Sequence, residues 1–242
     1  MTQTFPTADS LAYVLLVGTT ASFNQQIGLD LAGSGYQTIV VDTPAQAQKR
    51  IQQMRPSMVI VNYAKLGQRG IDFCRGLRDK QMVQPILFVV AQDQVADRVV
   101  CLEAGADDYL LQAYRQEKFL QLLSVYLQPK TNGQREQLLF GDLILDLNSR
   151  SVWRSPSGIE DDPPQVIELT VKEFELLKYL MSYPQQTLTR EQILKNVWGD
   201  DFQGESNVIE VYIRYLRLKI EKKGGKRLIQ TVRGVGYVLK DA

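Results

Sequence analysis

Short, nearly continuous apolar runs alternate with stretches of helical periodicity through the first half of the chain. The apolar runs resemble strands and cover Leu11–Gly18, Tyr36–Val41, Met58–Asn62, Pro85–Val90 and Asp108–Leu111. The helical stretches cover Phe23–Gly33, Ala45–Met54, Ile71–Asp79, Gln94–Glu103 and Glu117–Leu127. Apolar strands of this kind are typical of parallel sheets, and the alternation indicates a doubly wound α/β domain. We therefore predict a five-stranded parallel sheet for residues 1–127, with ligands at the carboxyl ends of its strands.

A different pattern begins after residues 128–137, a polar segment with the proline and Asn-Gly signals of a linker. Residues 138–169 hold short strand-like runs around an acidic, proline-rich loop. Three helical patterns and a closing hairpin follow at Thr170–Met181, Thr189–Val197, Ser206–Ile220 and 228–239. Three helices followed by a hairpin predict a winged helix-turn-helix, so we expect an α+β domain over residues 138–242.

The last of these helices has two unlike faces. Its apolar stripe consists of Ile209, Ile213, Leu216 and Ile220. The opposite face carries Val211, Arg214, Tyr215 and Leu218, flanked by Glu210, Tyr212, Arg217 and Lys219. Arginine can form a two-pronged bond to guanine, and apolar groups can meet the thymine methyl. The outward face therefore suits the major groove of double-stranded DNA.

Charge is distributed unevenly along the chain. Residues 206–240 contain nine Lys/Arg and two Glu, a net of +7, whereas residues 130–205 contain eight Lys/Arg and thirteen Asp/Glu, a net of −5. The formal charge of the whole chain, +1, conceals this basic end. A local basic surface is the electrostatic signature of a nucleic-acid-binding domain.

Composition excludes several classes of site. The chain has no histidine, which removes the usual general base and the commonest zinc ligand. Its two cysteines, Cys74 and Cys101, predict a reducing, cytoplasmic setting without disulfides or a zinc finger, and we expect them to be buried rather than redox-active. No apolar run is long enough to span a membrane. We expect neither enzymatic activity nor a cofactor.

The segments RPSMVIVNYAKLGQRGIDFCRGLR and VADRVVCLEAGADDYLLQAY resemble the receiver domain of bacterial two-component response regulators. That family uses an aspartate as phosphoryl acceptor, an acidic pair for Mg²⁺, a Thr/Ser and a Lys. The matching positions in this chain hold Asn62 for the acceptor, then Gly18, Thr19, Val90 and Gln112. Phosphoryl transfer needs an anionic nucleophile and charge neutralisation. The resemblance thus implies a pseudo-receiver that is not phosphorylated at this site.

The same resemblance implies a homodimer through the receiver. The matching positions of the family's dimer face are Asp97, Arg98, Asp107, Asp108 and Leu122. Leucine stands at position 122 where the family usually has arginine. This change indicates a more apolar and constitutive dimer, a different partner for this face, or simply a buried helix position.

The segments LTVKEFELLKYLMSYPQQTLTREQILKNVWGDDF and YIRYLRLKIEKKGGKRLIQTVRGVGYVL resemble the effector domain of the OmpR/PhoB class of response regulators. The resemblance implies that the third helix reads base edges with Glu210, Val211, Arg214 and Tyr215. Phosphate contacts are implied for Asn207, Tyr212, Arg217, Lys219 and Thr231, and minor-groove contact for Arg233 beside Gly234. Tyr237 either contacts phosphate or packs under the wing.

The loop Trp198–Glu205, with Asp200 and Asp201, matches the region where family members contact RNA polymerase, although Trp198 can equally be a core residue. We interpret the chain as a DNA-binding transcriptional regulator that acts as a dimer on direct repeats without aspartyl phosphate. The alternatives are an interaction module, in which the pseudo-receiver binds a regulatory protein, and a small-molecule sensor that uses the pocket around Gly18, Asn62 and Gln112.

Overall fold

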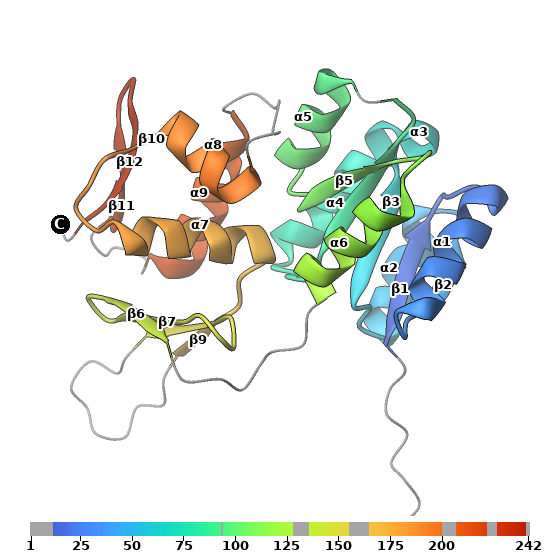
Figure 1. Ribbon diagram of the computed structural model, residues 1–242, viewed down its shortest axis with the longest axis horizontal. Helices are drawn as coiled ribbons and strands as arrows, with labels where there is room; N and C mark the ends of the chain where they lie inside the picture. Colours follow the sequence, from blue (N-terminus) through green and yellow to red (C-terminus); the bar gives the residue numbers. More distant parts are fainter. Residues whose placement is uncertain are drawn as a thin grey trace, which may run out of the picture.

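The computed structural model describes residues 12–92, 94–127, 136–154, 165–199, 207–221 and 227–240. They form two domains joined through residues outside these ranges (Figure 1). Most of the predicted linker, residues 128–137, lies outside the described ranges, and only its end enters the first strand of the second domain. The predicted elements all exist, with boundaries within three residues of those expected from the sequence.

The N-terminal domain contains a five-stranded parallel sheet with strand order β2-β1-β3-β4-β5, which confirms the predicted doubly wound architecture. Strands β1, β3 and β4 are buried along their whole length, because helices cover both faces. The strands are β1 (Tyr13–Val17), β2 (Gln37–Val41), β3 (Met58–Asn62), β4 (Ile86–Val90) and β5 (Asp108–Leu111). The helices are α1 (Ala21–Gly33), α2 (Pro44–Gln53), α3 (Tyr63–Leu66), α4 (Gln68–Asp79), α5 (Val95–Glu103) and α6 (Gln116–Leu127).

The C-terminal domain opens with an antiparallel sheet of order β6-β7-β8-β9, followed by three helices and a three-stranded wing sheet of order β10-β12-β11. This arrangement confirms the predicted winged helix-turn-helix. Its strands are β6 (Gln137–Phe140), β7 (Leu143–Asp146), β8 (Ser151–Arg154), β9 (Gln165–Ile167), β10 (Leu188–Thr189), β11 (Ile229–Val232) and β12 (Gly236–Leu239). Its helices are α7 (Val171–Ser182), α8 (Arg190–Trp198) and α9 (Asn207–Ile220).

Capping fixes where α7 begins. Thr170 accepts a hydrogen bond from the Glu173 backbone N–H at 3.3 Å, and the Glu173 carboxylate accepts one from the Thr170 backbone N–H at 2.8 Å. This reciprocal pair satisfies two backbone donors that the helix itself cannot. A second capping box, between Thr189 and Gln192, begins α8 in the same way. The two capping boxes therefore fix the residues at which α7 and α8 begin, and both helices pack against α9.

The two domains pack directly against each other. Helix α9 lies against α5, and Leu102 of α5 belongs to the hydrophobic cluster of the C-terminal domain. Leu102 is fully buried in this position. The N-terminal domain therefore contributes to the core that supports α9.

Candidate functional site

The residues at the degenerate phosphoacceptor positions meet at the carboxyl edge of the parallel sheet, as predicted. Asn62 ends β3, is buried, and its side-chain oxygen accepts a hydrogen bond from the Lys65 backbone N–H at 3.2 Å. The amide thereby caps the short helix α3. Its oxygen is engaged by the protein's own backbone, and an amide oxygen is a poor nucleophile.

A leucine that was not predicted for this pocket fills the space beside Gly18. Gly18 has a φ of +68°, and a Cβ added there would lie 2.9 Å from the Leu66 side chain. Leu66 is itself buried, on α3. Any acidic side chain at position 18 would displace it.

The other residues of the pocket are neutral. Thr19 and Val90 are buried, and the Thr19 hydroxyl finds no hydrogen-bond partner among the described residues. The backbone N–H of Gln112 donates to the Val90 carbonyl at 2.8 Å. Mg²⁺ prefers several hard, anionic oxygen ligands, and none of the predicted positions supplies a carboxylate. The chemistry of this pocket does not fit a magnesium-dependent phosphoryl acceptor.

Helix α9 packs on its domain through a wider face than the sequence predicted. The expected stripe of Ile209, Ile213, Leu216 and Ile220 is buried throughout. Val208 and Tyr212 are buried as well. Leu218, on the predicted outward face, is 70% exposed. The predicted apolar stripe is therefore confirmed, and Arg214 and Leu218 are exposed as expected, whereas Tyr215 of the predicted outward face is buried.

Tyr212 corrects the prediction of a phosphate contact. Its side chain is 2% exposed, and its hydroxyl donates a hydrogen bond to the Ala106 carbonyl of the N-terminal domain. Its ring packs edge-on against Trp198, with centroids 5.2 Å apart. Burial raises the pKa of the Tyr212 hydroxyl well above its ordinary value, which keeps it a donor. In this structure Tyr212 therefore contributes a hydrogen bond to the interface between the two domains.

The residues expected to read bases face the N-terminal domain across a cleft of about 560 Å³. The cleft is lined by Glu210, Val211, Arg214 and Tyr215 of α9, and by Arg75, Asp79 and Glu103 of α4 and α5. Tyr215 is buried, and a Cβ at Gly105 would lie 3.5 Å from its ring. The Arg214 guanidinium stacks 4.9 Å from the centroid of that ring. Of the four α9 residues, Tyr215 is buried and Val211 is half-buried at the interdomain interface, whereas Glu210 and Arg214 are exposed in the cleft.

Two of the predicted phosphate contacts are occupied by internal partners. The Lys219 ammonium donates to the buried Glu173 carboxylate at 2.6 Å, and Arg217 donates to the Ile229 carbonyl and, at 2.9 Å, to the Thr231 hydroxyl. Burial lowers the pKa of the Arg217 guanidinium. These contacts hold α9 to α7 and to the wing. In this structure Lys219 therefore forms an ion pair within the effector domain in place of the predicted phosphate contact.

The remaining predicted DNA contacts lie on the surface. Asn207 at the start of α9 is exposed, as are Thr231, Arg233 and Gly234 of the wing. Gly234 has a φ of +74°, a conformation that favours glycine at this turn. Tyr237 is buried beneath the wing, which supports the packing interpretation.

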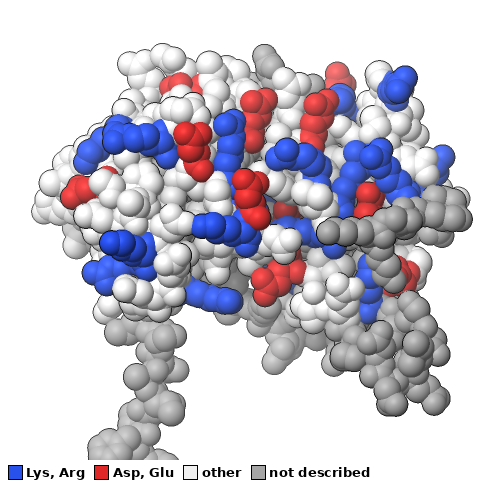
Figure 2. Space-filling model, turned by 180° about the vertical axis from the view of Figure 1, so that it is seen from behind, with Lys and Arg blue, Asp and Glu red and all other residues white. Residues whose placement is uncertain are grey.

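Figure 2 shows Lys and Arg side chains interspersed with Asp and Glu over one face of the molecule. The positive charge there does not form one continuous field. A continuous basic surface would favour unspecific attachment to phosphates.

Trp198 ends α8 and packs against the core of the C-terminal domain, beneath the Lys172 ammonium at 5.9 Å from the ring centroid. The core interpretation of Trp198 is thereby supported. Asp200 and Asp201, the other predicted polymerase contacts, lie outside the described residues.

The predicted dimer face requires a correction. Asp107 is 0% exposed, because its carboxylate accepts hydrogen bonds from Arg78 at 2.6 Å and from the Ile86 backbone N–H at 2.8 Å. Arg98 is also buried and donates to the Tyr109 hydroxyl at 3.1 Å. Neither side chain is available to a second subunit.

The other predicted dimer residues are placed differently. Asp97 and Asp108 are both half-buried, and Asp108 accepts a hydrogen bond from the Tyr126 hydroxyl at 3.0 Å. Leu122 is also half-buried, and it packs against the core that supports α6. The α5 part of this face meets α9 of the same chain.

Both cysteines are buried in the core of the N-terminal domain, as predicted. Burial raises the pKa of the Cys74 thiol to about 12 and raises that of Cys101 further. Since the thiolate is the reactive form, neither thiol is suited to redox sensing in this structure.

Comparison with known proteins agrees with this architecture. Residues 14–124 match the family described as "Response regulator receiver domain", and residues 164–239 match "Transcriptional regulatory protein, C terminal". The response regulator MprA of Mycolicibacterium vanbaalenii is 38% identical over 94% of this chain and 97% of its own length. The uncharacterized transcriptional regulatory protein YkoG of Bacillus subtilis is 33% identical over 94% of this chain and 98% of its own.

Among solved structures, a cysteine-to-aspartate mutant of RitR aligns with a TM-score of 0.60 and 26% identity, covering 96% of this chain and all of that one. Within the described ranges, no helix is both long and apolar enough to cross a membrane.

Two matched domains in this order, and relatives that match from end to end, establish the family. The chain belongs to the response regulators of the OmpR/PhoB class, with a receiver followed by a winged-helix DNA-binding domain.

Proposed function

We propose that this protein regulates transcription by sequence-specific binding of double-stranded DNA, and that domain docking rather than aspartyl phosphate controls the binding. The observation that carries this proposal is that the predicted base-reading residues of α9 line a cleft against the receiver, where Tyr215 is buried and Tyr212 is hydrogen-bonded to Ala106. A recognition helix inserts its outward face into the major groove, and the receiver residues Arg75, Asp79 and Glu103 border that face of α9. Full insertion into the groove therefore requires the two domains to separate.

Burial at the interface makes the docked arrangement favourable. Leu102 of the receiver and Tyr212 of α9 are each at most 2% exposed. Burying one large apolar side chain stabilises a contact by about 1.5–3 kcal/mol. Docking of a few kcal/mol is the range in which a ligand or partner can shift a two-state equilibrium.

The pocket chemistry supports independence from phosphorylation. Asn62 replaces the acceptor and caps α3, while Leu66 fills the space beside Gly18. Acetyl phosphate with Mg²⁺ should leave the intact mass of the protein unchanged. A stoichiometric gain of one phosphoryl group on the receiver would contradict this part of the proposal.

The proposed partners follow from the same arrangement. Two copies bind direct repeats as a homodimer, and the segment after Trp198 contacts RNA polymerase. Because Asp107 and Arg98 are internal, the dimer uses the exposed remainder of the receiver face, or the surface that α9 leaves on undocking.

A charge reversal tests the docking proposal. Glu103 of α5 lines the interdomain cleft together with Arg214 of α9, so Glu103→Lys places another cation there and should weaken docking and tighten DNA binding. Glu117→Lys on α6 makes the same change in net charge at an exposed position outside the cleft. DNA selection, then titration of the selected site against salt, compares the two variants with wild type. Equal gains in both variants would indicate a plain charge effect and refute docking control.

A further inference from the structure

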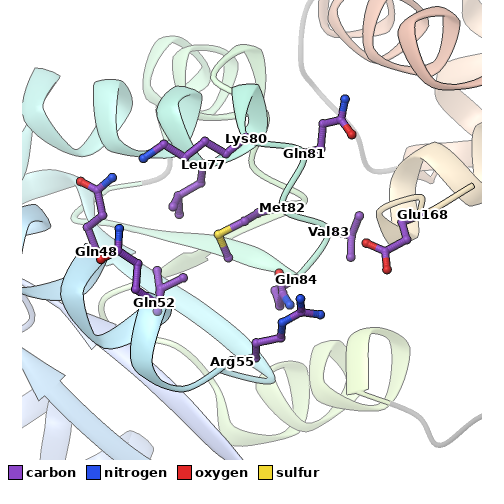
Figure 3. Close-up of a pocket in the computed structure, with 11 residues that line it drawn as sticks. Gln48, Gln52, Arg55, Leu77, Lys80, Gln81, Met82, Val83, Gln84 and Glu168 are labelled. Carbon is purple, nitrogen blue, oxygen red and sulfur yellow. The ribbon is translucent and has the colours of Figure 1, made fainter.

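A second cleft, of about 460 Å³, lies at the amino-terminal edge of the receiver sheet (Figure 3). It is formed by α2, the end of α4 and the loop of residues 81–84, which precedes β4. The degenerate phosphoacceptor pocket is at the opposite, carboxyl edge of the same sheet. One residue of the effector domain, Glu168, completes the wall. The volume of the cleft falls in the range of small-molecule sites, roughly 300–1,000 Å³.

The lining combines an apolar floor with separated charges. Leu77 and Met82 lie along the centre, and Figure 3 shows Lys80 and Arg55 on opposite sides of Met82. With Glu168, the lining carries two cations and one anion, a net of +1. Among the described residues, no carboxylate lies within ion-pair distance of Arg55 or Lys80. The cleft thus favours a ligand with an apolar body and a negative group.

Four carboxamides add hydrogen-bonding capacity around the floor. They belong to Gln48, Gln52, Gln81 and Gln84. In the part of the chain that the structure describes, none of these side chains has a protein hydrogen-bond partner. A carboxamide both donates and accepts, as do the edges of a nucleobase, and a thioether makes favourable contacts with aromatic rings.

We propose that this cleft binds a mononucleotide. The base lies over Met82 and Leu77, its edges meet the carboxamides, and the phosphate is bound by Arg55 or Lys80. The proposal joins the three features of the lining in one ligand: a planar apolar body, mixed donors and acceptors, and a single anionic group.

Arg78 connects this cleft to the docking site of α9. Its buried guanidinium donates to the Met82 carbonyl at 2.7 Å and the Gln84 carbonyl at 3.0 Å, which fixes the cleft loop. The same group donates to the Gly105 carbonyl at 2.7 Å and to the Asp107 carboxylate at 2.6 Å. The turn so held carries Ala106, whose carbonyl accepts the Tyr212 hydroxyl. One side chain therefore supports both the ligand loop and the surface on which α9 docks.

The coupling has a definite sign, and this part rests on the proposed function. Glu168 is the one lining residue from the effector domain, and its carboxylate repels the phosphate, so the nucleotide binds the undocked arrangement better. A ligand that binds one arrangement better shifts the population toward it. The nucleotide should therefore raise DNA affinity, and DNA should raise nucleotide affinity by the same factor.

Isothermal titration of the full-length protein with AMP, GMP, CMP and UMP tests the site without DNA. At least one should bind, while inorganic phosphate and adenosine should bind more weakly because each lacks half of the contacts. Arg55→Gln and Lys80→Gln remove exposed charges at the two ends of the cleft. Loss of the cation that binds the phosphate should weaken binding about tenfold. Arg69→Gln, an exposed cation of α4 outside the cleft, is the matched control.

The outcomes are distinct. Failure of all four mononucleotides to bind, or binding that neither cleft variant alters, would overturn the site. Loss of nucleotide binding in Arg233→Gln, on the wing, would instead place the nucleotide on the DNA surface and also overturn it. Nucleotide bound at the cleft without change in DNA affinity would refute only the coupling. If the protein binds no DNA sequence, the proposed function fails, and the nucleotide titrations still decide the site.

Discussion

Tyr212→Phe separates two opposite interpretations of α9. As a phosphate contact, the hydroxyl would strengthen DNA binding, and its removal would weaken it. In the structure the hydroxyl donates to the Ala106 carbonyl across the interdomain interface, and the side chain is 2% exposed. Removing the hydroxyl leaves that carbonyl without this donor only in the docked arrangement. The variant should therefore bind DNA more tightly than wild type.

The magnitude follows from the hydrogen bond. A typical buried hydrogen bond contributes about 0.5–1.5 kcal/mol, and an unsatisfied buried partner costs about 1–3 kcal/mol. If the docked state predominates, weakening it by about 1–3 kcal/mol raises the DNA-competent fraction, and the apparent affinity, roughly 5–150-fold. The ring remains, so its packing against Trp198 is retained.

Fluorescence anisotropy with the selected DNA site measures this change. The matched control is Tyr179→Phe, which removes a hydroxyl that accepts a hydrogen bond from Asn196 within the effector domain. Its DNA affinity should stay at the wild-type value. Weaker binding by Tyr212→Phe, with an unchanged melting temperature, would refute the docking interpretation and restore the phosphate contact.

Lys219→Met should lower the free energy of unfolding by about 3–5 kcal/mol, because it leaves the buried Glu173 carboxylate without its cation. Urea denaturation measures this loss, and adding Glu173→Gln should recover part of it. Arg214→Ala should cost about 1–3 kcal/mol of specific DNA binding and relax sequence preference in a selection experiment, whereas unchanged selectivity would show that α9 reads bases through other residues. Cys74 and Cys101 should resist alkylation at pH 8 in the folded protein and react after unfolding, because burial raises their pKa. Because the thiols ionise at lower pH in the unfolded chain than in the folded one, the free energy of unfolding should decline as pH rises from about 9 toward 12. Rapid alkylation of the native protein would contradict the burial of the two thiols.

Local patterns were sufficient to predict the fold. Continuous apolar runs such as Met58–Asn62 specify buried parallel strands, and the spacing of Thr170 and Glu173 specifies the start of α7. The replaced acceptor chemistry at Asn62 could also be inferred from the residue itself, because no conformation makes an amide an anionic nucleophile. Leu66 was missed, since the sequence does not reveal that its side chain points toward Gly18.

The sequence by itself determined the fold, the apolar stripe on which α9 packs and the neutral residues at the matching phosphoacceptor positions, because these depend on periodicity and on the identity of single side chains. Only the tertiary structure decided what the polar residues contact. Tyr212 and Asp107 appeared to be surface groups, yet one bonds to Ala106 and the other to Arg78. Both partners are distant in sequence, and the free energy that buries a polar group comes from such a partner. No pattern within one helix can show whether its outward face meets water, DNA or the neighbouring domain.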